Sequence, residues 1–115
     1  MSQLKITLPL PDRDLHPNAR VHRMALATKK RQARRLAKVQ SFAQVGIVAV
    51  KSYRLDFYHA TRRNRDEDGA ISSCKAYLDG LADCMQQDDS SFKCKGVEFH
   101  IDVLSPRLEI LIETE

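Results

Sequence analysis

The sequence predicts an α+β fold in which two helices pack on a mixed sheet of about four strands, in the order β-α-β-α-β-β. Short segments in which apolar and polar residues alternate indicate the strands, and two longer segments with apolar residues three and four positions apart indicate the helices. A chain of 115 residues is expected to form a single domain, 1–115, with one modest core. It contains no internal repeat and no low-complexity tract.

The first predicted strand covers Leu4 to Leu8, where apolar and polar side chains alternate. Prolines follow closely, and they end the strand and impose an extended loop. The loop carries several charged residues, so it either lies over a ligand or simply crosses the surface. We expect His16 and His22 to be surface residues rather than ligands.

The first predicted helix runs from about Asn18 to Ala43, with Asn18 as its N-cap. Its buried face is expected to consist of Val21, Met24, Ala25, Thr28, Leu36, Val39 and Phe42. The other face is strongly basic, and residues 20–42 include no acidic residue to pair with it. This basic face is either an ordinary solvated surface or a surface that contacts phosphate.

The second half of the chain contains one more helix and three more strands. A half-buried strand is predicted over about Ala49 to His59, and a helix over about Ala70 to Met85. The helix has a regular apolar stripe made of Ile71, Cys74, Leu78, Leu81 and Met85. Two alternating segments follow, and we expect them to form an antiparallel hairpin joined through Ser105-Pro106.

A stretch that carries both signs of charge separates the second strand from the second helix. It reads Arg62-Arg63-Asn64-Arg65-Asp66-Glu67-Asp68. If the segment is extended, Asp66 and Asp68 point to the same side. With a third carboxylate from Asp88 or Asp89, they would offer the hard oxygen ligands that Mg²⁺ prefers, while the arginines attract phosphates. The alternative is a solvated turn in which an aspartate caps the next helix.

These residues resemble a known family. The segments Arg65-Asp66-Glu67-Asp68-Gly69, Ser73-Cys74-Lys75-Ala76-Tyr77-Leu78-Asp79-Gly80-Leu81-Ala82-Asp83 and Asp88-Asp89-Ser90 are similar to the RusA family of small, phage-associated Holliday junction resolvases. Leu8-Pro9-Leu10-Pro11 resembles the opening strand and proline loop of that family. The resemblance extends from about Leu4 to the last predicted strand.

The resemblance implies a RusA-like fold and a magnesium-dependent endonuclease, with Mn²⁺ as an alternative ion. Members of the family resolve four-way DNA junctions by paired nicks in recombination and repair, and they act as homodimers. The resemblance implies catalytic roles for Asp66, Asp68, Asp89 and Lys75, with the metal held by the three aspartates. We expect contacts to branched DNA from two basic groups, Arg62, Arg63 and Arg65 together with Lys29, Lys30, Arg31, Arg34 and Arg35.

The chain also departs from the family pattern. Gly69 stands where many relatives carry asparagine, and the segment between Asp68 and Lys75 is about three residues longer than in the best-known form. Judged without the resemblance, Lys75 is a surface lysine that pairs with Asp79 one helical turn away. Two other functions therefore stay open: a branched-DNA-binding protein without catalysis, and an unrelated basic α+β domain that binds nucleic acid or protein through its first helix.

Composition supports an anionic partner inside the cell. The formal net charge is +4 and the sequence pI is about 9.1, which favours binding to a polyanion. The three cysteines form no Cys-x-x-Cys motif, so we expect reduced and mostly buried thiols. No apolar run approaches the roughly 20 residues of a membrane helix, and the chain is predicted to be cytoplasmic.

Overall fold

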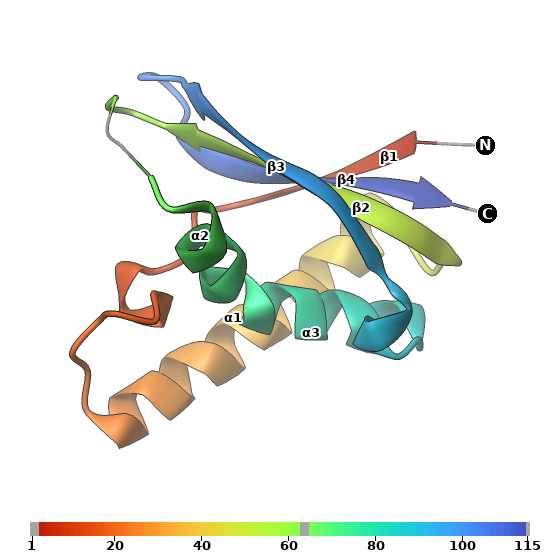
Figure 1. Cartoon of the computed structure of the whole chain (residues 1–115). Coiled ribbons are helices and arrows are strands. Elements are labelled where there is room, and N and C mark those ends of the chain that lie inside the picture. The colour runs from red at the N-terminus through yellow and green to blue at the C-terminus, as the bar shows by residue number, and fades with distance from the viewer. Residues whose placement is uncertain (1–2, 63–64, 115) are drawn as a thin grey trace.

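The computed structural model describes residues 3–62 and 65–114, so Arg63, one of the expected DNA contacts, lies outside the described residues. The fold is α+β, as predicted, with a mixed four-stranded sheet. Figure 1 shows the helices on one face of the sheet, while the other face carries none of the described helices. The elements are β1 (Gln3–Leu8), α1 (Arg23–Gln44), β2 (Val50–His59), α2 (Glu67–Ser73), α3 (Lys75–Met85), β3 (Lys93–Ile101) and β4 (Arg107–Thr114).

The strand order is β1-β4-β2-β3, and this contradicts the predicted hairpin. Among the described strands, β3 pairs with β2 alone and runs parallel to it, whereas β4 lies between β1 and β2 and is antiparallel to both. The physical reason is burial. Leu108, Ile110 and Ile112 of β4 are fully buried, which requires a central strand, but Phe99 and Ile101 of β3 are partly exposed, as suits an edge.

Helix α1 begins later than predicted and buries a different face. His22 rather than Asn18 caps it, through an Nδ1 that accepts a hydrogen bond from the Met24 N–H at 3.2 Å. Val39 and Phe42, expected inside, are 51% and 64% exposed. The buried positions of the helix are instead the small residues Ala33, Ala37 and Ser41.

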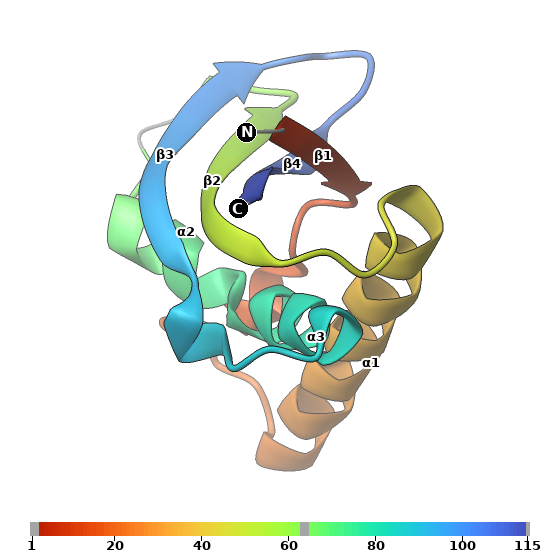
Figure 2. The same cartoon turned by 90° about the vertical axis from the view of Figure 1, so that its right-hand side faces the viewer.

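A glycine in α3 explains this choice of face. A Cβ atom at Gly80 would overlap the carbonyl oxygen of Arg34 and would lie 2.9 Å from Cβ of Ala37. The two helices therefore pack backbone to backbone, which only small side chains permit. Figure 2 shows α1 and α3 together beneath the sheet.

The second predicted helix is divided into α2 and α3 at Cys74, whose backbone has ψ near 0°. Residues 3–62 and 65–114 therefore contain three α-helices rather than the two that were predicted. The predicted apolar stripe is nevertheless confirmed, since Cys74, Leu78, Leu81 and Met85 are buried and Ile71 is partly buried. One consequence is that Lys75 is the first residue of a new helix.

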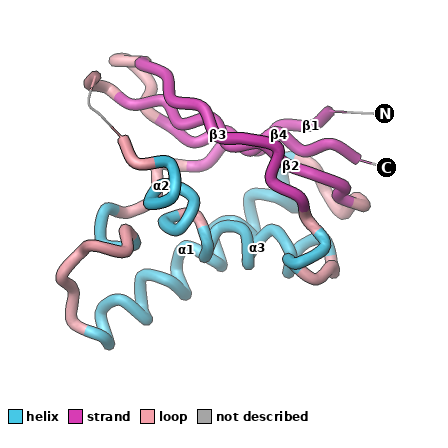
Figure 3. The backbone as a smooth tube through the Cα atoms, in the orientation of Figure 1, coloured by secondary structure: helices cyan, strands magenta, loops and turns pink. Residues whose placement is uncertain are grey.

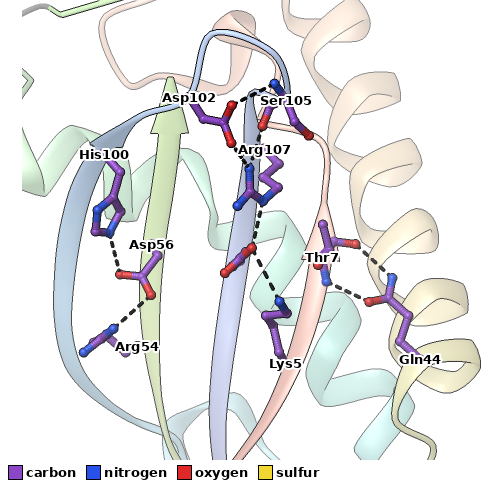
Figure 4. A network of polar contacts seen from close by, with 10 residues as sticks. Lys5, Thr7, Gln44, Arg54, Asp56, His100, Asp102, Ser105 and Arg107 are labelled. Atoms are coloured by element: carbon purple, nitrogen blue, oxygen red, sulfur yellow. Dashed lines mark hydrogen bonds and ion pairs between the residues drawn. The ribbon is translucent and has the colours of Figure 1, made fainter. Parts of the chain in front are cut away.

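Polar side chains attach the helices to the sheet. Gln44, the last residue of α1, exchanges two hydrogen bonds with the backbone of Thr7 in the edge strand β1, at 2.7 and 2.9 Å (Figure 4). Gln87 does the same with the backbone of Val50 in β2, at 2.7 and 3.2 Å. These bonds also satisfy backbone groups of both strands that the sheet ladder leaves free.

The loop between β1 and α1 forms part of the helical layer. It contains a 3₁₀ turn, η1 (Arg13–Leu15), that contacts both α1 and α2. Figure 3 shows this loop, coloured as loop and helix, passing from the sheet to the start of α1. Tyr77 of α3 donates a hydrogen bond to the carbonyl oxygen of Pro9 at 3.0 Å and so fixes the beginning of the loop.

The thiols agree with the sequence prediction. All three cysteines are free, and Cys74 and Cys84 are buried while Cys94 is exposed. Burial raises the pKa of Cys74 to about 12, so this thiol is protonated and unreactive.

None of the helices in the described part of the chain is both long and apolar enough to cross a membrane.

Candidate functional site

Asp66 caps the N-terminus of α2. Its carboxylate accepts hydrogen bonds from the backbone N–H groups of Asp68 at 3.2 Å and Gly69 at 3.1 Å. The expectation that Asp66 and Asp68 share one side of an extended segment is therefore wrong, because the cap starts a helix at Glu67. Asp66, Glu67 and Asp68 are all exposed at the helix end, where the helix dipole favours negative charge.

His16 lies against this helix end, although the sequence indicated an ordinary surface residue. A Cβ atom at Gly69 would be 2.5 Å from His16 Nε2 and 2.9 Å from Asp66 Oδ2. Glycine at position 69 thus leaves room for the imidazole beside the start of α2. His16 Nδ1 accepts a hydrogen bond from the Asn18 N–H at 3.2 Å, which in the neutral ring leaves the proton on Nε2. The only signal in the sequence was its position in the proline-rich loop.

Lys75 and Asp89 form the second part of the site. The Lys75 ammonium donates a hydrogen bond to Asp89 Oδ2, and another to Asp79 Oδ1 at 2.9 Å. Asp89 belongs to a 3₁₀ turn, η2 (Asp89–Ser91), and Asp88 caps that turn by accepting from the Ser90 N–H at 3.0 Å. Of the two adjacent aspartates, Asp89 is therefore the one that meets Lys75.

This contact fixes the charges of both groups. The hydrogen bonds from Lys75 to Asp89 and then to Asp79 raise the pKa of the lysine, and the Lys75 hydrogen bond lowers the pKa of Asp89. Both groups are consequently ionised at neutral pH. Lys75 remains 64% exposed, so its ammonium is also accessible to a ligand.

Two adjoining clefts contain most of these residues, whereas Asp68 lines neither of them. Lys75, Asp79 and Asp89 line a cleft of about 720 Å³, and the basic helix α1 forms another wall of it through Lys30, Arg31 and Arg34. Asp66 lines a second cleft of about 640 Å³ with Arg65, His16 and His59. Ser73 lines both clefts, so the two halves of the site are neighbours.

The basic residues of α1 differ in how they are engaged. Lys29 binds Asp12 at 3.0 Å and Asp14 at 2.7 Å, and Arg34 binds Asp83 through two hydrogen bonds of 2.6 and 2.8 Å. The acidic partners missing within the helix are thus supplied by other segments. Lys30, Arg31 and Arg35 show no acidic partner within residues 3–62 and 65–114, so these three are the better candidates for binding phosphates.

The predicted metal ligands are not gathered at one point. In the described part of the chain, Asp66, Asp68 and Asp89 do not form a group of three donors within 4.8 Å. Asp66 is turned toward N–H groups of its own helix and Asp89 toward Lys75. The donor chemistry of the Asp66 and Asp68 pair still fits Mg²⁺, which commonly uses one or two protein carboxylates and keeps its remaining waters.

Of the expected arginine contacts to DNA, Arg62 is exposed and Arg65 lines the second cleft.

No protein-family model matches the chain. A protein from Xylella fastidiosa (strain Temecula1), described as uncharacterized, is 39% identical to the chain over 93 residues. The match covers 76% of this chain and 61% of that protein, so the chain spans about three-fifths of its relative's length. The description of the relative names no activity, and the function is therefore inferred from the residues.

Proposed function

We propose that this chain is a RusA-like, divalent-metal-dependent endonuclease that cleaves branched DNA such as a four-way junction. The observation that carries the proposal is the ion pair of Lys75 and Asp89, which lies in a cleft walled by the basic helix and adjoins the cleft of Asp66. A lysine and several carboxylates beside a basic wall suit the hydrolysis of a phosphodiester. The family resemblance supports the same conclusion.

The proposal assigns the aspartates and the lysine different roles. Asp66 and Asp68 would hold Mg²⁺ at the start of α2. Bound Mg²⁺ supplies Lewis acidity and lowers the pKa of water. Lys75, held in place by Asp79 and Asp89, stabilises the negative charge that develops on the phosphate during cleavage.

The basic wall of α1 accounts for DNA binding. Lys30 and Arg31 line the cleft beside Lys75 and would contact phosphates next to the one that is cut. Because such contacts release counterions, affinity should fall as salt increases. We further propose a homodimer, since two sites related by a two-fold axis match the approximate symmetry of a four-way junction.

A labelled, immobile four-way junction and a matched linear duplex, each with and without Mg²⁺, test the proposal. We expect paired nicks in the junction only, and only with Mg²⁺. Asp68→Asn should abolish them, whereas Glu67→Gln should not, since Glu67 is a neighbouring carboxylate without an assigned role. Equal cutting by the Asp68→Asn variant would overturn the assignment.

A branched-DNA-binding protein without catalysis is the second candidate. It is favoured by one observation, that Asp66, Asp68 and Asp89 are not gathered around one point in the described chain. The same experiment separates the two functions. Binding of the junction without any cleavage in either Mg²⁺ or Mn²⁺ would select this candidate.

A further inference from the structure

The uncovered face of the sheet carries a group of potential metal ligands that the proposed nuclease does not use. Asp56 of β2 and Glu98 of β3 are direct partners in the parallel register, and His100 lies two residues beyond Glu98. Side chains two residues apart on a strand share a face, so all three project from the same side of the sheet. Asp56 is only 2% exposed, although it is a carboxylate on a face without a covering helix.

The three side chains already have the spacing of metal ligands. His100 Nε2 lies 3.2 Å from Asp56 Oδ1 and 3.7 Å from Glu98 Oε2. One donor atom from each residue lies within 4.8 Å of the other two. Ligands bound tetrahedrally to Zn²⁺, at about 2.0–2.2 Å each, are separated from one another by about 3.3–3.6 Å.

Neighbouring side chains hold two of these ligands in place. Arg54 donates a hydrogen bond to the second oxygen of Asp56 at 3.0 Å, which leaves Oδ1 directed at His100 (Figure 4). The ring of Tyr58 stacks on His100 with centroids 4.5 Å apart, and the guanidinium of Arg107 lies 3.9 Å over the ring of Tyr58. Such outer contacts orient the ligands of protein metal sites.

We propose that Asp56, Glu98 and His100 bind one divalent transition-metal ion, with Zn²⁺ the best match, on the uncovered face of the sheet. One imidazole nitrogen and two carboxylate oxygens form a ligand set that suits Zn²⁺, whereas Mg²⁺ prefers oxygen ligands only. The side chains of His100 and Glu98 are 35% and 56% exposed, so an ion can enter from solvent and keep a water as its fourth ligand.

The effect of such an ion would be structural. β3 is at the edge of the described sheet and pairs with β2, and the ion would join these two strands through their side chains. The inference does not rest on the proposed nuclease function, because Asp66, Lys75 and Asp89 belong to the helical layer.

Calorimetric titration of chelator-treated protein with Zn²⁺, and separately with Mg²⁺, tests the site. We expect one Zn²⁺ per chain at this site and a higher melting temperature in its presence. His100→Ala should weaken binding at least about tenfold, since changes even behind metal ligands weaken binding about 10–100-fold. Glu98→Gln, at a largely exposed position that should not disturb folding, should have an effect in the same direction.

Two controls locate the ion. Glu113→Gln removes a carboxylate from β4 and should leave Zn²⁺ binding unchanged, and so should Glu67→Gln on the helical side, where no metal role is assigned to Glu67. Folding of each variant is checked by circular dichroism. The proposal is overturned if the protein binds no stoichiometric Zn²⁺, if folded Glu98→Gln binds it as tightly as the unchanged chain, or if Glu67→Gln abolishes binding instead.

Discussion

The two sides of the molecule use carboxylates differently. On the helical side, Asp66 and Asp68 are exposed at the end of a short helix, and Asp89 lies in a short turn where an accessible lysine meets it. On the uncovered face of the sheet, Asp56 and Glu109 are buried on central strands. Exposed carboxylates on the helical side can therefore bind a ligand at little cost to the free energy of unfolding. The buried carboxylates on the sheet face contribute to that free energy instead.

The largest effect on activity is expected on the helical side, at Lys75. Lys75→Met keeps the length of the side chain but removes the charge that we assign to the cleavage step. We predict a loss of junction cleavage of about 100-fold or more, as is typical when a group that stabilises a transition state is removed. Single-turnover cleavage measures this.

Lys51→Met is the matched control for Lys75→Met. Lys51 is an exposed lysine of β2 that lines neither helical cleft and has a weak pairing to Glu113 at 3.9 Å. The Lys51→Met variant should cleave the junction at the rate of the unchanged chain. Equal losses in both variants would show that any lysine contributes through general charge, and would remove the special role of Lys75.

The next largest effect is a loss of stability at the close contact between α1 and α3, which positions the basic helix beside the cleft. Gly80→Ala would force α1 and α3 apart, because its methyl group would overlap the carbonyl oxygen of Arg34. We predict a decrease in the free energy of unfolding of about 1–3 kcal/mol. Urea denaturation measures it, with Ala27→Ser on the exposed side of α1 as a control that should change little. An unchanged stability would mean that the helices pack less closely.

A direct test of the contrast compares two Asp→Asn variants. Asn caps helices about as well as Asp, so Asp66→Asn should change the free energy of unfolding by only about 0.3 kcal/mol. Asp56→Asn should lower it by about 1–3 kcal/mol, because it disturbs the partly buried hydrogen bonds that the buried Asp56 carboxylate makes with Arg54 and His100. Thermal or urea denaturation measures both changes. Similar decreases in the free energy of unfolding of the two variants would contradict the difference between the helical side and the sheet face.

The smallest effect is the pH dependence of the stability that the ion pair of Lys75 and Asp89 contributes. The pKa of Asp89 lies below its ordinary value of 3.8, so the stabilisation is present above that value and disappears as the pH falls through the lowered pKa. The stability difference between the unchanged chain and Lys75→Met should therefore be smaller near about pH 2 than near about pH 7. A difference that grew on acidification would contradict this sign.

Several parts of the fold could be predicted from local patterns. The alternation in β1 and β2 and the stripe of α3 identified both the elements and their buried sides, because burial there follows the local period. Two predictions failed where distant contacts decide. The buried face of α1 is set by Gly80 in another helix, and the place of β4 between β1 and β2 is set by the relative burial of β3 and β4.

The candidate site shows the same division. The resemblance pointed to Lys75 and Asp89, and the structure brings these two into contact across fourteen residues. The alternative interpretation of this segment, a turn in which an aspartate caps the next helix, is confirmed for Asp66. The position of His16 against Gly69 at the start of α2 and the burial of Asp56 depend on tertiary packing, so neither could be read from neighbouring residues.

The central claim is that the carboxylates of the helical side cut branched DNA, and Asp66→Asn tests it most directly because the variant keeps the helix cap. Its junction cleavage and junction affinity should be measured on the same preparation, in Mg²⁺, beside the unchanged chain. We predict that cleavage falls by about 100-fold or more while affinity and stability change little. Cleavage by Asp66→Asn at the rate of the unchanged chain, or no cleavage by either protein, would contradict the claim.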